Sequence, residues 1–176
     1  LKSRVKVMVV EQTAVQDAAW GDLYGAVDIW CPLFPLFDEE TAKARQALGE
    51  VLWTYTALAQ RSPPSPWWAT DQPLLNYRVP AWISWRYDIR GLLYWGSMVF
   101  WKQVEDPWTE SLTLDRSQQN PKTIYHGEGS LLYPGRAAGY DGLAPSLRLK
   151  ALRDGSEDYE YLAILRRAGQ GDAALA

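Results

Sequence analysis

Four short apolar segments, separated by stretches with helical or turn-like patterns, constrain the fold of this chain more than any other feature of its sequence. They comprise residues 5–10, 26–30, 51–57 and 91–95, and they are rich in the β-branched and aromatic residues that favour strands. Strands that alternate with helices build a parallel sheet or barrel. The sequence therefore predicts an α/β fold with four strands and three connecting helical segments, which corresponds to half of an eight-stranded (β/α)8 barrel.

Local signals place the helices between and after these strands. Asp38 is a good N-cap, and Glu39 and Glu40 follow it in the first turn, where the helix dipole favours carboxylates. Apolar residues at helical spacing predict a second helix, which Pro80 is expected to kink. The expected segments are a short helix or turn at 16–24, helices at 38–48, 73–87 and 146–168, an irregular arm at 104–122 and a short strand at 131–133.

The length of the chain bounds its domain organisation. A complete (β/α)8 barrel needs about 250 residues, and this chain has 176. Because it also enters its first strand directly after Leu1, without an initiator Met or a signal peptide, we interpret it as a fragment whose partner is the N-terminal remainder of its own barrel. The expected division is 1–103 for the second half of the barrel, 104–168 for the arm, Gly-rich loop and closing helix of the same domain, and 169–176 for a tail.

Charge and composition argue against several classes of protein. The formal net charge is −3, and no cluster of Lys and Arg is longer than a pair, which argues against a nucleic-acid partner. No apolar run approaches the ~20 residues that span a bilayer, so no membrane span is expected. Cys31 and His126 are each the only residue of their type, so the sequence predicts no internal disulfide, no His/Cys zinc site and no cofactor.

The aromatic residues point to a ligand. The chain has ten Trp and ten Tyr but only three Phe. A ring with a polar group can offer its apolar face to sugar C–H groups while its N–H or O–H bonds a hydroxyl. Several of these rings end the predicted strands, and the carboxyl ends of barrel strands form the ligand face. The set therefore predicts a carbohydrate substrate, and the alternative for any single Trp is a place in the core.

Candidate substrate contacts come from the strand ends and the glycine-rich turn. Trp95, at the end of the last predicted strand, is expected to be the platform under a pyranose ring. Glu128 lies between two glycines that allow a tight turn, so it is expected to accept hydrogen bonds from sugar hydroxyls, with His126 beside it as a donor. The full candidate set is Asp28, Trp30, Trp53, Tyr55, Tyr94, Trp95, His126 and Glu128.

The two-residue period of strands links members of this set. Trp53 and Tyr55 are expected to share one strand face. Asp28 is expected to point the same way as Trp30, and at that depth its carboxylate either binds the sugar or pairs with an Arg. The charged positions near the C-terminus predict a helix held to the rest of the fold by ion pairs: Arg148, Arg153, Asp154, Glu157 and Asp158, with Arg78 and Trp82 packing on the preceding helix.

The most specific strings lie in the last third of the chain. They are Gly-Glu-Gly-Ser-Leu-Leu-Tyr-Pro-Gly at 127–135 and Ser-Leu-Arg-Leu-Lys-Ala-Leu-Arg-Asp-Gly-Ser-Glu-Asp-Tyr-Glu-Tyr-Leu at 146–162. Together with Val-Asp-Ile-Trp at 27–30 and Trp-Thr-Tyr-Thr at 53–56, they resemble the carboxyl half of the catalytic domain of glycoside hydrolase family 123. The resemblance covers nearly the entire chain. One departure is that the family loop usually reads Gly-Asp-Gly where this chain has Gly-Glu-Gly.

This resemblance implies a fold and a reaction. Family members are β-N-acetylgalactosaminidases, or relatives without assigned substrates, in which a (β/α)8 barrel follows a β-sandwich. The implied reaction is retaining, substrate-assisted hydrolysis: the 2-acetamido oxygen attacks the anomeric carbon, an Asp orients the acetamido group and an adjacent Glu protonates the leaving oxygen. The family carries that pair at the end of its fourth strand. With 91–95 as the eighth strand, the chain covers strands 5 to 8, and the pair is expected upstream of Leu1.

Several expectations depend on this resemblance. The substrate is expected to be a terminal β-linked N-acetylhexosamine, with N-acetylgalactosamine preferred, and Tyr55 is expected to orient its acetamido group. Asp38-Glu39 begins a helix and is interpreted as a cap, so no catalytic pair is expected in the chain and the fragment alone is expected to be inactive. The alternatives are a non-catalytic carbohydrate-binding or structural domain and, less favoured, an ordinary carboxylate pair of Asp28 and Glu128. The resemblance favours a secreted or periplasmic location.

Overall fold

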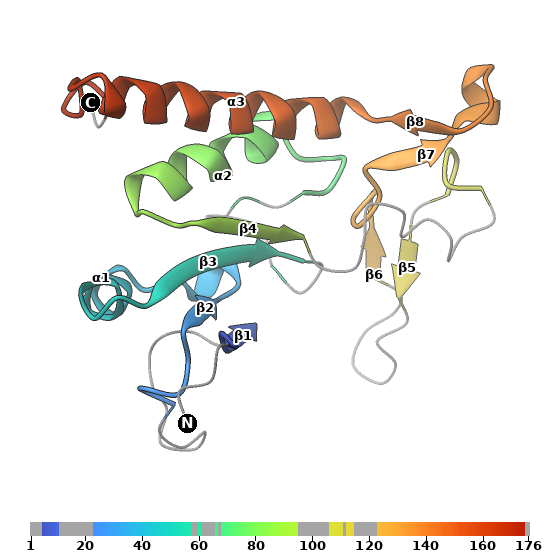
Figure 1. Cartoon of the computed structure of the whole chain (residues 1–176). Helices are drawn as coiled ribbons and strands as arrows, with labels where there is room; N and C mark the ends of the chain where they lie inside the picture. Colours follow the sequence, from blue (N-terminus) through green and yellow to red (C-terminus); the bar gives the residue numbers. More distant parts are fainter. Residues whose placement is uncertain are drawn as a thin grey trace.

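The computed structural model of the chain describes residues 5–10, 23–57, 60, 66, 68–94, 106–110, 112–114 and 123–174. Over these residues the fold is α/β: a parallel sheet carries helices, and two short antiparallel ladders lie beyond one end of it (Figure 1). The predicted α/β class is therefore confirmed. The expected helix or turn at 16–24 lies almost entirely outside the described residues.

The main sheet contains the four strands that the sequence predicts. It consists of β1 (Met8–Val10), β2 (Ile29–Cys31), β3 (Val51–Thr56) and β4 (Gly91–Tyr94). The strands lie side by side in chain order, and every neighbouring pair is parallel. Their carboxyl ends therefore lie at one edge of the sheet, the carboxyl edge, and the arrowheads of β3 and β4 point toward β5 and β6 in Figure 1.

The two faces of the sheet carry different cores, because side chains alternate along a strand. The face toward the helices, the helix face, holds Trp30 and Leu52, which pack with Ala42 of the first helix. The opposite face, the far face, is formed by side chains of the strands and of the residues directly after them: Met8, Val10, Cys31, Leu33, Trp53, Tyr55, Ala57 and Leu93. The expectation that Trp53 and Tyr55 share a face is confirmed.

Helix α1 (Glu39–Ala47) follows the expected capping pattern. The Asp38 carboxylate accepts a hydrogen bond from the Thr41 backbone N–H at 2.8 Å, and this contact lowers the pKa of Asp38. At the other end of the helix, Arg45 forms a nearly buried ion pair with Glu50. Glu50 also accepts from the Trp30 indole Nε1 at 2.6 Å. This side-chain cluster fixes α1 against β2.

Helix α2 (Leu75–Arg86) continues on both sides of Pro80. Proline has no N–H, so the carbonyl four residues earlier loses its helical donor. That carbonyl belongs to Asn76, and it accepts a hydrogen bond from the indole Nε1 of Trp68 at 3.0 Å. An indole from the loop after β3 therefore replaces the missing backbone donor and ties this loop to α2.

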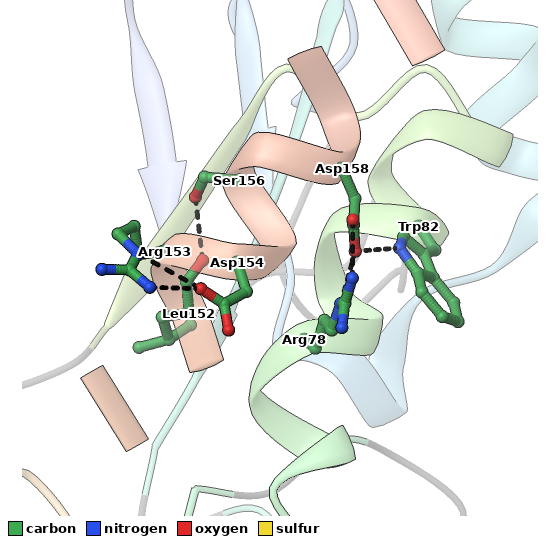
Figure 2. Close-up of polar contacts among 7 residues, drawn as sticks. All are labelled: Arg78, Trp82, Leu152, Arg153, Asp154, Ser156 and Asp158. Carbon is green, nitrogen blue, oxygen red and sulfur yellow. Dashed lines mark hydrogen bonds and ion pairs between the residues drawn. The ribbon is translucent and has the colours of Figure 1, made fainter. Parts of the chain in front are cut away.

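Helix α3 (Leu147–Arg167) begins at the Ser146 cap and lies along α2 (Figure 1). Arg78 of α2 donates two hydrogen bonds to the Asp158 carboxylate, at 2.6 and 2.8 Å, and Trp82 Nε1 donates a third at 2.8 Å (Figure 2). These contacts lower the pKa of Asp158, chiefly through Arg78. Arg153 pairs within α3 with Asp154 and Glu157. The expected attachment by ion pairs is therefore confirmed for Asp158, whereas the pairs of Arg153 lie within α3 and do not connect it to another element.

Gly155 lies where α3 approaches α2 most closely. A Cβ at this position would lie 2.7 Å from the Arg78 carbonyl oxygen and 3.1 Å from the Arg78 Cα. Both neighbours are backbone atoms, which cannot rotate out of the way. The glycine is therefore a packing requirement of the α2–α3 contact, even though it sits in the interior of a helix.

We expect Gly155→Ala to destabilise the protein. Helix propensity alone favours alanine by about 1 kcal/mol, but forcing a methyl group into a closed contact typically costs about 1–3 kcal/mol. Urea unfolding would measure the net change. The control is Ser156→Ala, one exposed position further along the same helix, which should stay within about 0.5 kcal/mol of the parent. A more stable Gly155→Ala protein would show that the two helices can separate freely.

The remaining elements form the end of the molecule beyond the carboxyl edge. Strand β5 (Leu112–Leu114) pairs with β6 (Thr123–Tyr125), and β7 (Leu132–Pro134) pairs with β8 (Leu143–Pro145), both antiparallel. Short 3-10 turns are η2 (Phe34–Leu36) and η4 (Gly135–Ala138). The arm predicted as irregular thus contains a strand, and β8 is a further strand that the sequence does not predict. No helix among the described residues is long and apolar enough to cross a membrane.

Candidate functional site

The carboxyl edge is the place where the structure gathers most of the predicted site. The segment 68–70 follows β3, and the glycine turn 126–129 reaches the same edge from the far end of the chain. The backbone N–H of Thr70 donates to the His126 carbonyl at 2.6 Å. The backbone N–H of Gly129 donates to the hydroxyl of Tyr94, the last residue of β4. Tyr94, His126 and Glu128 are therefore brought together from two distant parts of the sequence.

The two glycines around Glu128 have the left-handed backbone that the sequence suggests. Their φ angles are 64° at Gly127 and 73° at Gly129, a region that residues with a Cβ rarely adopt. The resulting tight turn directs Glu128 inward rather than toward solvent. The Glu128 residue is only 2% exposed, and both of its carboxylate oxygens are buried. A contact between Glu128 and sugar hydroxyls stays a prediction for a buried side chain, whereas His126 on the same turn is exposed.

Burial and charge determine the electrostatics beneath this turn. Burial, followed by the nearby Glu128 carboxylate, raises the pKa of the Tyr94 hydroxyl. Burial also raises the pKa of Tyr77, and the positive charge of Arg148 opposes part of this effect. Both phenols therefore remain protonated and act as neutral hydrogen-bonding groups. The Tyr77 hydroxyl donates to the Ala69 carbonyl at 2.7 Å.

Arg148 holds the turn to its surroundings. Its side chain lies inside the fold, because the residue is only 6% exposed. One guanidinium nitrogen donates to the Gly127 carbonyl at 2.7 Å and to the Trp68 carbonyl at 3.4 Å. The other donates to the Ser130 carbonyl and, at 2.7 Å, to the Tyr133 hydroxyl. One buried cation therefore connects α3, the loop after β3, the glycine turn and β7.

Trp53 and Tyr55 form a second group, on the far face of the sheet. Trp53 lies over Gly91 of the neighbouring strand, where a Cβ would collide with the indole. Tyr55 is the last but one residue of β3, and its backbone N–H donates to the Pro32 carbonyl at 3.1 Å. Tyr94 belongs to the helix face, with Trp68 and Tyr77. The predicted site residues therefore approach the carboxyl edge from both faces of the sheet.

Asp28 and Trp30 lie elsewhere, contrary to the expectation from their spacing. Asp28 precedes β2, at the amino edge of the sheet, where its carboxylate accepts from Lys6 Nζ at 3.1 Å and from the Val7 N–H at 2.8 Å. Within the described part of the chain it thus pairs with a lysine. Trp30 is completely buried on the helix face and bonded to Glu50. Because Asp28 and Glu128 lie at opposite edges, the structure contradicts an ordinary carboxylate pair of these two residues.

The sequence missed the residues that support the turn. Trp68 and Tyr77 pack against Tyr94, and Trp68 contacts the Tyr94 ring edge-on at 4.7 Å between ring centroids. Trp68 sits in a proline-rich loop, and Arg148 is one of several charged residues at helical spacing, so neither stands out by pattern. The position that the sequence favoured most, Trp95, lies outside the described residues.

The chemistry of the described residues is that of binding and orientation. They include no group of three or more His, Cys, Asp or Glu placed to hold a metal ion. Burial raises the pKa of the Cys31 thiol to about 12, so this side chain is not a thiolate nucleophile at neutral pH. At the carboxyl edge the imidazole of His126 is exposed, whereas the rings of Tyr55, Trp68 and Tyr77 are buried.

Comparisons with known proteins identify a family and a similar fold. The model of the family described as "Glycoside hydrolase 123, catalytic domain" matches residues 3–165. The fold is similar to that of a family 123 glycoside hydrolase from Clostridium perfringens, whose structure was used to analyse the details of glycolipid glycan hydrolysis. The TM-score is 0.67 at 18% sequence identity, and the match covers 96% of this chain but 28% of that chain. At this identity the similarity establishes the fold. A comparison with curated proteins gives no match.

Proposed function

The chain belongs to the catalytic-domain family of glycoside hydrolase 123, and from this premise we propose that the protein containing it hydrolyses terminal β-linked N-acetylhexosamine residues, with N-acetylgalactosamine as the preferred sugar. The observation that carries the proposal is the family match over residues 3–165. The carboxyl edge supports it, because aromatic and phenolic groups gather where barrel enzymes bind their substrates.

In this proposal the parallel sheet is one half of a (β/α)8 barrel, and its far face is the barrel interior. Two features support this. Strands β1 to β4 are all parallel and in chain order, and α1 and α2, the helices between them, pack against one face only. The cluster on the far face draws only on strands and the residues that directly follow them. The other strands, and the adjacent Asp–Glu pair of the family, are supplied by a part of the protein outside this chain.

The reaction proposed is retaining, substrate-assisted hydrolysis. The acetamido carbonyl oxygen of the substrate attacks the anomeric carbon while the Glu of the pair protonates the leaving oxygen. The role of this chain is to hold the substrate. Tyr55, near the carboxyl end of the far face, orients the acetamido group, and Trp53 lines the wall beside it. The glycine turn with His126 borders the same edge, and Trp95 is the proposed platform for the sugar ring.

A non-catalytic carbohydrate-binding domain is the second candidate. The observation that favours it is the position of two adjacent carboxyl pairs: Asp38-Glu39 starts α1 and Glu157-Asp158 lies within α3, so neither of these reaches the carboxyl edge. A third adjacent pair, Glu105-Asp106, is described only at Asp106. The two candidates make different predictions for the complete protein, because only the first requires bond cleavage.

The test is hydrolysis of an aryl N-acetyl-β-galactosaminide by the complete protein, with the anomeric form of the first product followed by NMR. We expect release of the β-anomer, as retention requires. The 176-residue chain alone should give no turnover, because it lacks the proton donor. Binding of the glycoside without cleavage by the complete protein would support the second candidate, and cleavage by the chain alone would exclude an external acid pair.

A further inference from the structure

An open pocket of about 320 Å³ lies where helix α2 meets helix α3. The described residues that line it all belong to these two helices: Trp82, Asp158, Tyr161 and Leu162. Ile83, the next residue of α2, packs into the core on the helix face of the sheet, so the sheet separates this pocket from the far face. The volume of the pocket falls within the range of about 300–1,000 Å³ typical of small-molecule sites.

Two exposed aromatic rings line this pocket. Trp82 is 43% exposed and Tyr161 is 67% exposed, although both belong to regular helices. A single exposed aromatic side chain is common on protein surfaces, but two that border the same pocket form a larger apolar surface, which marks an interaction site. Both rings also carry a polar group, so they suit a ligand that is itself partly polar.

Trp82 is held in one orientation before any ligand binds. Its indole Nε1 donates to the Asp158 carboxylate at 2.8 Å (Figure 2). The guanidinium carbon of Arg78 lies 5.8 Å from the centroid of the Trp82 ring. The polar edge of the indole is therefore committed to the protein, and what the side chain offers to a ligand is an aromatic surface. Because this surface is already ordered, little conformational entropy is lost on binding.

Asp158 adds a charged acceptor to the wall of the pocket. Its side chain is still 20% exposed, although Arg78 and Trp82 together donate three hydrogen bonds to it. These contacts lower the pKa of Asp158, so the carboxylate is ionised at neutral pH. The two oxygens of a carboxylate have about four acceptor positions, so a ligand hydroxyl can donate a further, charge-assisted hydrogen bond.

This combination suits a neutral sugar better than other small ligands. The C–H groups of a pyranose pack against an aromatic surface, and its hydroxyls donate to a carboxylate. A purely apolar ligand would remove water from Asp158 without giving it a new partner. A cationic ligand would compete with Arg78, which already pairs with the same carboxylate.

We propose that the pocket between Trp82 and Tyr161 binds a neutral hexopyranose unit other than the one that is cleaved, with Trp82 as its platform and Asp158 as the acceptor of a hydroxyl. The inference goes beyond the proposed function, because it adds a non-catalytic sugar site on the helix side of the sheet. A second site of this kind raises the effective concentration of a glycan with several sugar units at the protein.

The test is fluorine NMR of the complete protein labelled with fluorotryptophan, during a titration with methyl β-galactoside. This sugar has a continuous apolar face and no acetamido group, so it is not a substrate of the proposed reaction. Trp82→Phe identifies the Trp82 signal, because that variant lacks it. In the parent protein this signal should shift with a Kd on the order of 1 mM, since a ligand of this size gains limited affinity per atom.

Two variants of Tyr161 measure the contribution of the second ring. Tyr161→Leu keeps an apolar side chain but removes the ring, so it should raise the Kd reported by the Trp82 signal about tenfold. Tyr161→Phe keeps the ring and should retain most of the affinity. Because Tyr161 is mostly exposed, neither variant should lower the melting temperature noticeably.

Trp108→Leu is the matched control. Trp108 is similarly exposed, at 46%, and its indole also donates to a protein oxygen, the Pro134 carbonyl at 3.0 Å, but it does not line this pocket. This variant should leave the titration of the Trp82 signal unchanged. An equal rise of the Kd in Trp108→Leu and Tyr161→Leu would overturn the proposed site.

The remaining outcomes are equally decisive. A Trp82 signal that does not respond to the sugar, or that gives the same Kd in Tyr161→Leu as in the parent, would overturn the proposal. A Trp82 signal that changes with protein concentration in the absence of sugar would assign the pocket to a contact between copies of the protein instead. The result does not depend on the proposed reaction: failure to cleave N-acetylhexosaminides would disprove the proposed function, and the titration would still test this pocket.

Discussion

Arg148→Met should lower the free energy of unfolding by about 3–5 kcal/mol, because it removes the charged member of a buried polar cluster. Methionine fills much of the same volume but donates no hydrogen bond. The carbonyls of Trp68, Gly127 and Ser130 would each lose a charged donor inside the fold. Arg148→Lys should recover only part of the loss, since a single ammonium cannot span acceptors on several segments as a planar guanidinium does. Urea unfolding of the protein measures both variants.

The control for this prediction is Arg153→Met on the same helix. Arg153 pairs with Asp154 and Glu157, but its side chain is 64% exposed. Exposed ion pairs typically contribute about 0.2–1 kcal/mol, so this substitution should be nearly silent. Similar losses for the two methionine variants would mean that Arg148 does not connect the glycine turn to the rest of the structure.

Tyr55→Phe should lower kcat on N-acetylhexosaminides about 10²-fold, the usual cost of losing one preorganised donor to an oxygen that gains charge in the transition state. The ring stays, so its packing with Cys31, Leu33 and Ala57 on the far face is preserved and the melting temperature should hardly change. The position of Tyr55 is well fixed, because β3 continues to pair with the chain beyond β2 through a bridge between Leu33 and Tyr55. The measurement is steady-state kinetics of the complete protein.

Two further measurements sharpen this test. Tyr55→Phe should also weaken binding of an N-acetylhexosamine thiazoline, which imitates the cyclised intermediate, because transition-state-like ligands report the same interaction. Tyr159→Phe is the matched control: this phenol packs against Trp85 at the α2–α3 contact, with 5.3 Å between the ring centroids. If kcat is the same in Tyr55→Phe as in the parent, Tyr55 belongs to the core alone.

Features that depend on neighbours in the chain could be read from the sequence. The Asp38 cap is one such feature, because its partner is the N–H three residues later. The shared face of Trp53 and Tyr55 is another, because strand geometry alone sets it. The four strands and α3 follow in the same way from hydrophobic periodicity and capping. The strings at 127–135 and 146–162 indicated the family, which the comparison confirms.

Features that depend on distant partners could not be read in this way. Asp28 has the right type and spacing for a ligand contact, yet it directly precedes β2, at the amino edge of the sheet, and pairs there with Lys6. Glu128 was correctly placed on a tight turn, but its burial depends on Arg148 and Tyr94, which arrive from α3 and β4. A local sequence pattern does not indicate which distant residues a turn will contact in the folded chain.

Two positions show the tertiary structure overriding a local rule. Pro80 removes a backbone donor from α2, but the indole of Trp68 supplies a donor to the Asn76 carbonyl. Gly155 should weaken α3, but the backbone of Arg78 lies too close for any side chain. The sequence by itself determined the four parallel strands, the three helices and the family. The tertiary structure decided which residues reach the carboxyl edge, because burial and hydrogen-bond partners are set by contacts between segments far apart in the chain.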